Sequence, residues 1–138
     1  MKRRVLFLCT GNSCRSQMAE GLLRHLAEDR FDIASAGTNP AGLNPMAIEA
    51  MREIEIDIGH HLSKSVETLQ GEPFDYVITV CDRAQEACPT YPATTSLFHW
   101  SFDDPAAAPG TPEERRVVFR HVRDQIAARI RVFAEHLC

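Results

Sequence analysis

The sequence predicts a single α/β domain of three layers, in which helices cover both faces of a central four-stranded parallel sheet. Four short β-type runs occur at residues 5–8, 31–36, 76–80 and 95–98, and helical patterns lie between them and after them. This alternation is typical of βαβ units, which build a parallel sheet. The 138 residues suffice for one hydrophobic core and are too few for two, so we expect one domain over residues 1–138.

The N-terminal half of the chain contains two of these strands and two helices. The apolar run 5–8 ends at Cys9, and the run 31–36 ends at Gly37. Asn44 followed by Pro45 is a helix cap with proline at the first helical position, which predicts a helix from 45 to about 51. The first helix, which begins at Arg15, is amphipathic. Its apolar face is formed by Met18, Ala19, Leu22, Leu23, Leu26 and Ala27, and its polar face by Glu20, Arg24 and Glu28.

The C-terminal half supplies the other strands and the last helix. Residues 65–69 predict a short helix, and the run 76–80 predicts a buried strand that stops at Cys81. The residues Thr-Pro-Glu-Glu at 111–114 form a capping box, which opens a helix. Its apolar stripe consists of Val118, Val122, Ile126, Ile130, Phe133 and Leu137.

Composition limits the classes of function. Charged residues make up 25% and hydrophobic residues 44% of the chain, as in ordinary globular domains. The net charge of −4 argues against nucleic acid or an anionic membrane as the main partner. No apolar run approaches the roughly 18 residues of a membrane span, and the run behind the basic start Met1–Arg4 ends after four residues. We expect a cytoplasmic protein that acts as a monomer.

The segment 9–16, between the first strand and the first helix, is predicted to bind a tetrahedral oxyanion. Backbone N–H groups and the positive end of the helix dipole meet at such a loop, and glycine or asparagine can adopt the left-handed turn that it needs. The guanidinium of Arg15 adds a planar fork of donors. The predicted binding residues are Thr10, Gly11, Asn12, Ser13, Cys14, Arg15 and Ser16.

Cys9 is the candidate nucleophile at the floor of this loop. Helix N-termini and guanidinium groups stabilise thiolates, so Cys9 needs no separate base. The hydroxyls of Ser13 and Ser16 can donate to the thiolate or to the anion. Two alternatives are a buried structural cysteine, which leaves Arg15 unexplained, and a module that binds an oxyanion without turnover.

Cys81 and Cys88 form a second candidate site. Ligands of open parallel sheets bind beyond the carboxyl ends of the strands, so Cys9 and Cys81 are expected at one edge of the sheet. A regular helix would separate residues 81 and 88 by about 10.5 Å, whereas a disulfide needs Cα atoms within roughly 4.4–6.8 Å. The pair can therefore form a disulfide only if the segment unwinds; the alternative is two inert thiols. The cysteine spacings do not fit a zinc site, so no metal is expected.

Asp104 is the candidate general acid. Asp104 followed by Pro105 places a carboxyl group in a stiff loop, from which it could protonate a leaving oxygen if the loop reaches Cys9. The alternative is an ordinary turn residue. Asp103 is the less favoured candidate of the two.

These residues together resemble the low-molecular-weight protein tyrosine phosphatase superfamily and, within it, the thioredoxin-coupled arsenate reductases. The resemblance begins with the stretch from Cys9 to Gly21 and extends over nearly the whole chain. The further matching segments are Ser35–Gly37, Asn44–Met51, His61, the Cys81 and Cys88 pair, His99–Trp100 and Phe102–Pro105.

The resemblance implies a low-molecular-weight phosphatase fold and a thiol relay. Cys9 would attack arsenate, held by Arg15 and the loop, while Asp104 protonates the departing oxygen. Cys81 would then attack Cys9 and release arsenite, and Cys88 would move the disulfide to the 81–88 pair. Thioredoxin would reduce that disulfide from outside, so no bound cofactor is implied. Phosphate or sulfate would act as mimics of arsenate.

The main alternative is a phosphatase that works through a phosphocysteine at Cys9. Arsenate and phosphate share geometry and charge, so the loop does not discriminate between them. Phosphotyrosine enzymes of this fold commonly carry aromatic residues after the acid loop, where this chain has alanine at 106–108. A hydrolase also has no use for Cys81 and Cys88. Weak activity on aryl phosphates is still expected.

Some residues are assigned supporting roles. Some arsenate reductases of this kind hold potassium with residues that match Asn12, Glu20, Ser35 and an aspartate. Lys64 stands in the place of that aspartate, so we expect its ammonium to pair with Glu20 and potassium to be unnecessary. Cys14 is expected to be packed away beside the loop or to form a protective disulfide with Cys9, and Cys138 to be an incidental thiol. His61 and His99 are expected to be structural hydrogen-bonding groups, and Trp100 to belong to the core or the pocket wall.

Overall fold

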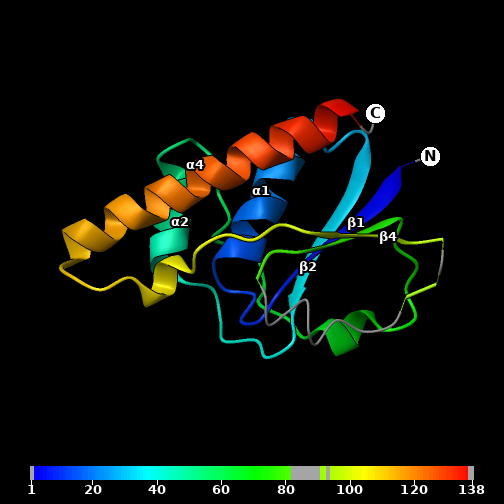
Figure 1. The fold of residues 1–138 in the computed structure, drawn as a ribbon, viewed down its shortest axis with the longest axis horizontal. Coiled ribbons are helices and arrows are strands. Elements are labelled where there is room, and N and C mark those ends of the chain that lie inside the picture. Colours follow the sequence, from blue (N-terminus) through cyan, green and yellow to red (C-terminus); the bar gives the residue numbers. More distant parts are fainter. Residues whose placement is uncertain (1, 82–90, 93, 137–138) are drawn as a thin grey trace.

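The central sheet has four parallel strands in the order β2-β1-β3-β4 (Figure 1). The computed structural model describes residues 2–81, 91–92 and 94–136. Strand β1 (Arg3–Cys9) lies between β2 (Phe31–Gly37) and β3 (Tyr76–Thr79), and β4 (Ser96–His99) forms the edge beyond β3. The predicted single domain with a four-stranded parallel sheet is confirmed.

The helices begin at the capping residues that the sequence indicated. The side chain of Asn44 accepts a hydrogen bond from the Met46 amide at 2.8 Å. Thr111 and Glu114 exchange two hydrogen bonds, at 3.1 and 3.2 Å, as a capping box requires. The described α-helices are α1 (Arg15–Ala27), α2 (Pro45–Arg52) and α4 (Pro112–His136), and the short 3-10 helices are η1 (Val66–Leu69) and η2 (Pro105–Ala107).

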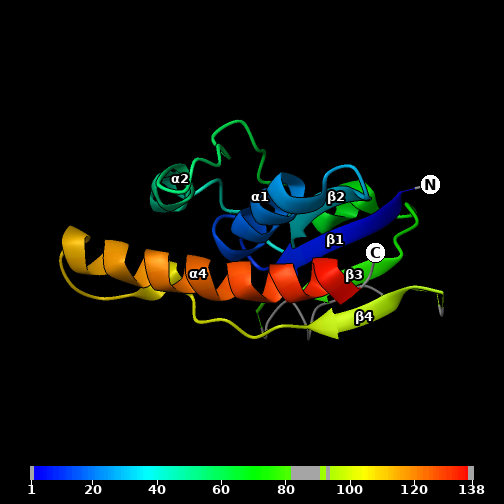
Figure 2. The ribbon, with the colours of Figure 1, turned by 90° about the horizontal axis from the view of Figure 1, so that it is seen from above.

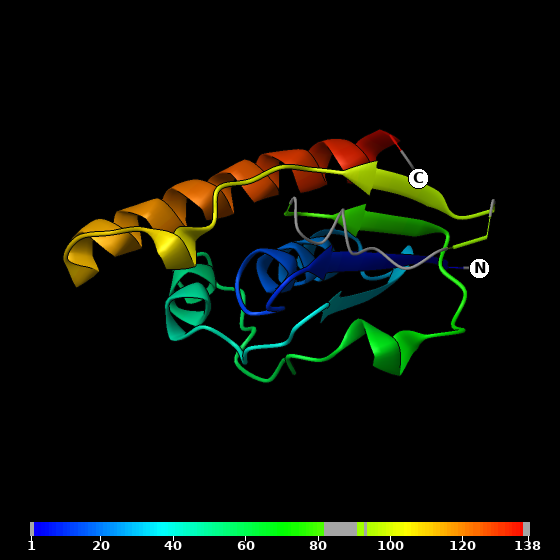
Figure 3. The ribbon, with the colours of Figure 1, turned by 60° about the horizontal axis from the view of Figure 1, so that its bottom comes forward.

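The chain crosses the sheet on both faces. The connection from β1 to β2 runs through α1, and the connection from β2 to β3 runs through η1 in the opposite direction. The second connection begins with α2, which packs against α1 and α4; because crossovers between parallel strands are right-handed, its later part, with η1, passes on the face opposite to α1. The long helices α1 and α4 pack against each other on one face, behind the strands in Figure 3 and side by side in Figure 2.

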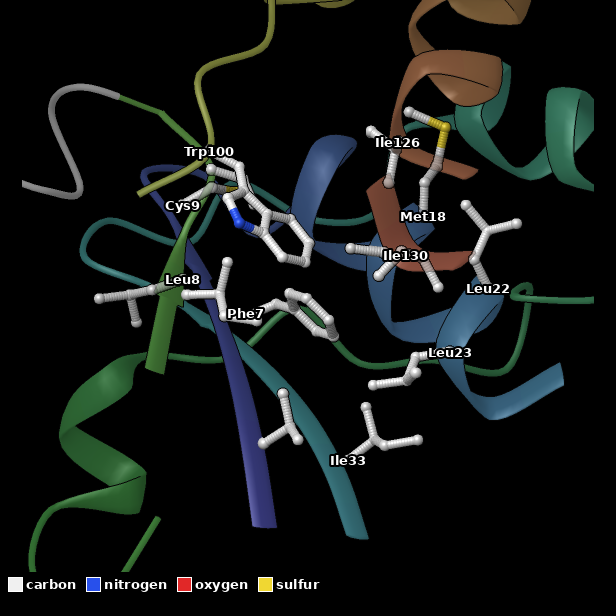
Figure 4. Packing of buried hydrophobic residues seen from close by; sticks show 14 of the residues in the cluster. Phe7, Leu8, Cys9, Met18, Leu22, Leu23, Ile33, Trp100, Ile126 and Ile130 are labelled. Carbon is white, nitrogen blue, oxygen red and sulfur yellow. The ribbon is translucent and has the colours of Figure 1, made fainter. Parts of the chain in front are cut away.

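The core lies between the sheet and these two long helices. Phe7 of β1 points toward α1 and α4 and meets Trp100 at a ring distance of 6.1 Å (Figure 4). Leu6 and Leu8 point to the opposite face and are also fully buried, so both faces of β1 are covered. Phe133 of α4 closes the core with ring contacts of 5.5 to 6.4 Å to Phe31, Tyr76, Phe98 and Trp100.

The structure corrects some side-chain positions. Leu26, predicted on the apolar face of α1, is 47% exposed. On α4, Val118 is only partly buried, and its neighbour Phe119, which the predicted stripe omitted, is buried in its place. Leu137 lies outside the described residues. None of the helices within the described ranges is long and apolar enough to cross a bilayer.

Replacement of Phe133 by alanine is expected to lower the free energy of unfolding by about 3–5 kcal/mol, because it removes a buried ring from four aromatic contacts. Urea unfolding followed by circular dichroism measures this loss. The matched control is Val132→Ala, since Val132 is the preceding residue on α4 and is 53% exposed. The control should change stability by about 0.5 kcal/mol or less. Equal losses in both variants would contradict the assigned core.

Candidate oxyanion-binding site

The two candidate sulfurs lie at the same edge of the sheet. Cys9 is the last residue of β1. The neighbouring strand β3 ends at Thr79, and the amide of the next residue, Val80, donates to the Leu8 carbonyl at 2.9 Å. Cys81 follows directly, and its sulfur lies 3.3 Å from the hydroxyl of Thr10. The parallel pairing of β1 with β3 therefore brings residues 9 and 81 together, as the sequence predicted.

The sulfur of Cys9 has two hydrogen-bond partners within the loop. The backbone N–H of Asn12 donates to it at 3.2 Å, and the hydroxyl of Ser16 lies 2.9 Å away. The same hydroxyl oxygen accepts from the side-chain amide of Asn12 at 2.9 Å, so its own hydrogen is left to point at the sulfur. Both contacts stabilise negative charge on the sulfur. The predicted role of Ser16 agrees with this geometry, whereas the hydroxyl of Ser13 donates to Cys14 instead.

Asn12 makes the left-handed turn of the loop, with φ of 47°. Gly11, which the sequence offered as the alternative for this turn, does not have a positive φ. The side chain of Asn12 is saturated and fully buried. Its amide nitrogen donates to Ser16 and Ser35, and its oxygen accepts from the amide of Lys64 and from Gln17. These bonds hold a backbone conformation that is otherwise unfavourable for a residue with a side chain.

A pocket of about 500 Å³ opens above the loop. Cys9 is only 3% exposed and is not itself one of the lining residues. Arg15 borders the pocket, where its guanidinium donates to the Phe102 carbonyl at 3.0 Å and lies 3.8 Å from the carboxylate of Asp104. The lining residues are Thr10, Gly11, Ser13, Cys14, Arg15, Cys81, Asp104 and Ala106.

Asp104 combines a structural role with a place in the pocket wall. One carboxylate oxygen accepts from the Ala106 amide at 3.0 Å and caps η2, while the other faces Arg15. The predicted alternatives, a turn residue and an acid at the site, are thus compatible. Asp103 does not line the pocket.

Cys14 is a buried neutral thiol at the edge of this pocket. Burial raises the pKa of Cys14 from its ordinary value of 9.0 to about 11, which the hydrogen bond from Ser13 lowers only in part. Both Cys9 and Cys14 are free in this structure. The thiol of Cys14 therefore stays protonated at neutral pH.

A buried polar network lies behind the loop. Ser35 accepts from Asn12 and donates to Glu20 at 2.5 Å, and the guanidinium of Arg24 pairs with the other oxygen of Glu20 at 2.9 Å. The predicted pair of Lys64 with Glu20 is wrong: of the described residues, Arg24 supplies the close cation, because it lies one helical turn after Glu20 on α1. Glu20, predicted on the polar face of the helix, is 4% exposed.

Gln17 is a site residue that the sequence did not reveal. It is fully buried and donates to the backbone and the side chain of Asn12. Its carbonyl oxygen lies 3.0 Å from Nδ1 of His61. Burial lowers the pKa of His61, against the opposing charge of Glu20, so His61 is a neutral hydrogen-bonding group. His99 contacts Thr79 at 2.7 Å and Trp100 is core, so the structural roles expected for these residues are confirmed.

A family model for low molecular weight phosphotyrosine protein phosphatases matches residues 4–138. The chain belongs to this family. An arsenate reductase of Shouchella clausii (strain KSM-K16) is 50% identical over 134 residues, which is 97% of this chain and 96% of the relative. The candidate loop at residues 9–16 lies within the matched residues.

Solved structures of this family share the whole fold. An arsenate reductase in its phosphate binding state superposes with a TM-score of 0.78 at 30% identity and covers 99% of both chains. A thioredoxin-dependent arsenate reductase of Corynebacterium glutamicum gives a TM-score of 0.76 at 27% identity, covering 98% of this chain and 61% of that one. The family therefore contains members named for phosphatase chemistry and members named for arsenate reduction.

Some sequence predictions concern residues beyond the described ranges. Cys88 and Cys138 lie outside them, so the second half of the predicted relay stays a prediction. Within residues 2–81, 91–92 and 94–136, no cluster of histidine, cysteine and carboxylate side chains has the arrangement of a metal site.

Ionisation of Cys14 is expected to destabilise the fold at high pH. The unfolded chain ionises this thiol from about pH 9, while the folded protein keeps it neutral to about pH 11, so unfolding is favoured as pH rises between these values. At pH 11 the difference amounts to about 2 kcal/mol, and it approaches its full value of about 3 kcal/mol only above that pH. Urea unfolding at several pH values measures this effect. We expect the free energy of unfolding of the wild type to fall more steeply over this pH range than that of Cys14→Ala. The same pH dependence of the unfolding free energy in both proteins would show that Cys14 is not buried as a neutral thiol.

We propose that potassium is not needed behind the oxyanion loop of this family member. The oxygens of Glu20 are engaged by Arg24 and Ser35, and the side-chain oxygen of Asn12 by Lys64 and Gln17, which leaves a poor set of donors for a cation. Potassium and sodium chloride at equal ionic strength should therefore give the same melting temperature and the same kcat/KM. A selective rise of either quantity in potassium would contradict this proposal.

Proposed function

We propose that this protein is an arsenate reductase that uses a relay of three cysteines. The observation that carries the proposal is that a second thiol, Cys81, lines the same pocket as the oxyanion loop and lies beside Thr10. Hydrolysis of a phosphate ester needs one nucleophile, whereas reduction needs a second sulfur to accept the oxidising equivalents. The relatives named as arsenate reductases, one of them 50% identical, support the same choice.

In the first step, the Cys9 thiolate attacks the arsenic atom of arsenate. A sulfur–arsenic bond forms, an arsenic–oxygen bond breaks, and the oxygen leaves as water with a proton from Asp104. The guanidinium of Arg15 and the loop amides neutralise the oxyanion during the attack. The contacts with Asn12 and Ser16 hold the sulfur of Cys9 in place within the loop.

In the second step, the thiolate of Cys81 attacks the sulfur of Cys9. The sulfur–arsenic bond breaks and its electron pair stays on arsenic, which is reduced from the pentavalent to the trivalent state and leaves as arsenite. The two sulfurs lose two electrons together and form a disulfide. Attack on sulfur requires a nearly linear approach of the incoming thiolate, so the end of β3 must bring residue 81 toward residue 9.

In the third step, Cys88 attacks Cys81 and carries the disulfide away from the pocket. An external dithiol protein of the thioredoxin type then reduces the 81–88 disulfide and restores all three thiols. The Corynebacterium glutamicum relative named as thioredoxin-dependent supports this reductant. Because thiols are kept reduced in the cytoplasm, we place the reaction there, in a monomer that needs no bound cofactor.

Phosphate ester hydrolysis is the second candidate function. The family description names phosphotyrosine substrates, and the pocket would accept phosphate as well as arsenate. Ala106 lines the pocket next to the acid loop, so a small side chain stands where an aromatic group could stack on a phosphotyrosine ring. We therefore propose only weak cleavage of aryl phosphates, through a phosphocysteine at Cys9.

Cys81→Ser and Cys88→Ser separate the two functions. Each variant should lose at least a hundredfold in arsenate turnover with thioredoxin, because the oxidised sulfur has no resolving partner, while cleavage of p-nitrophenyl phosphate stays within about twofold of wild type. Cys9→Ser should abolish both reactions. Steady-state assays with thioredoxin and its reductase measure the first reaction, and release of nitrophenol measures the second.

Cys138→Ser is the matched control, since it removes one thiol at the end of the chain and should leave both reactions unchanged. Full arsenate turnover in the variants of residues 81 and 88 would overturn the relay. Absence of arsenate turnover in the wild type, together with rapid ester cleavage, would establish the phosphatase instead.

A further inference from the structure

The segment 37–44, which follows β2, is bonded to the outer side of the oxyanion loop. Its amides donate to one loop carbonyl after another, and Ser63 adds a hydrogen bond to the Gly11 carbonyl at 3.1 Å. Among the carbonyls of residues 9–13, the one that is not bonded to this segment belongs to Asn12, which accepts from Gln17 at 3.2 Å. The amide-to-carbonyl pairs are Thr38 to Cys9 at 3.2 Å, Asn39 to Thr10 at 2.8 Å, Ala41 to Gly11 at 2.9 Å and Asn44 to Ser13 at 3.0 Å.

These bonds determine which way the loop amides face. No cis peptide bond occurs in the described chain, and in a trans peptide the C=O of one residue and the N–H of the next point in opposite directions. The carbonyls of Cys9, Thr10, Gly11 and Ser13 point outward to this segment, so the N–H groups of residues 10, 11, 12 and 14 point to the inner side of the loop. The hydrogen bond from the N–H of Asn12 to the sulfur of Cys9 agrees with this direction.

Gly37 sets how closely this segment can approach the loop. It pairs with Cys9 at the end of β2, and its own amide donates to the Lys64 carbonyl at 2.8 Å. A Cβ at position 37 would lie 2.5 Å from the carbonyl oxygen of Thr10 and 2.9 Å from the amide nitrogen of Asn12. Both are backbone atoms of the loop, so the loop itself would have to move.

We propose that the 37–44 segment is a positioning element for oxyanion binding, and that Gly37 is its determining residue. The segment does not touch the bound anion; it acts through the carbonyls of the loop, whose amides then converge on the anion and on Cys9. The inference rests on the proposed oxyanion role of residues 9–16, and it is independent of the reductant and of the second and third thiols.

Gly37→Ala tests the proposal directly. Inorganic phosphate should protect Cys9 of the wild type from iodoacetamide, with the extent of alkylation followed by mass spectrometry of the peptide that contains residue 9. In Gly37→Ala the phosphate concentration for half protection should rise at least tenfold, because one or more amide bonds to a charged ligand are lost. KM for p-nitrophenyl phosphate should rise with it.

Gly21→Ala is the matched control for loss of packing. A Cβ at position 21 on α1 would lie 2.6 Å from a methyl group of Ile58, so it also disturbs a buried contact, but at a side chain rather than at the backbone of the loop. This variant should lower the melting temperature and keep wild-type protection by phosphate. Equal weakening of protection in Gly21→Ala and Gly37→Ala would overturn the proposal, because general destabilisation would then account for both.

Ala41→Pro keeps the proposal testable if Gly37→Ala does not fold. Ala41 lies on an exposed stretch, and proline there removes the donor to the Gly11 carbonyl. We expect a tenfold or larger loss of phosphate protection in this folded variant. Wild-type protection in either folded variant would overturn the positioning role, and so would absence of protection in the wild type. Protection of the wild type without arsenate turnover would instead refute the proposed function alone.

Discussion

The oxyanion loop depends on the left-handed backbone of Asn12. This conformation is costly for a residue with a Cβ, and the four hydrogen bonds of its side chain offset the cost. The turn directs the backbone N–H of Asn12 at the sulfur of Cys9, and its side-chain amide orients the hydroxyl of Ser16 toward the same sulfur. One residue therefore determines both the shape of the loop and the surroundings of the proposed nucleophile.

The network behind Asn12 explains how one carboxylate, that of Glu20, is buried in this small domain. Glu20 would be strongly destabilising there without partners. Ser35 and Arg24 supply them, and a chain of hydrogen bonds connects the guanidinium of Arg24 through Glu20 and Ser35 to the side chain of Asn12. The geometry of the loop is thus linked to an ion pair on the first helix, rather than to the loop sequence alone.

Much of this arrangement could be predicted from the sequence, because strong local signals mark it. Apolar runs that end in cysteine predicted that residues 9 and 81 share an edge of the sheet, and the caps at Asn44 and Thr111 predicted where helices begin. The positions of Glu20 and Gln17 could not be predicted in this way, because amphipathic periodicity assigns polar residues to solvent. Their burial depends on partners distant in the sequence, such as Ser35 and His61, which only the folded chain brings close.

The buried thiol of Cys14 has a consequence for selectivity among the sulfurs. In the proposed reaction, the sulfur–arsenic adduct on Cys9 is bordered by two cysteines, at positions 14 and 81. Exchange at sulfur proceeds through the thiolate, and the thiol of Cys14 stays protonated until far above neutral pH. Desolvation of one side chain therefore suppresses a dead-end crosslink within the loop and leaves the productive exchange to the sulfur on the neighbouring strand.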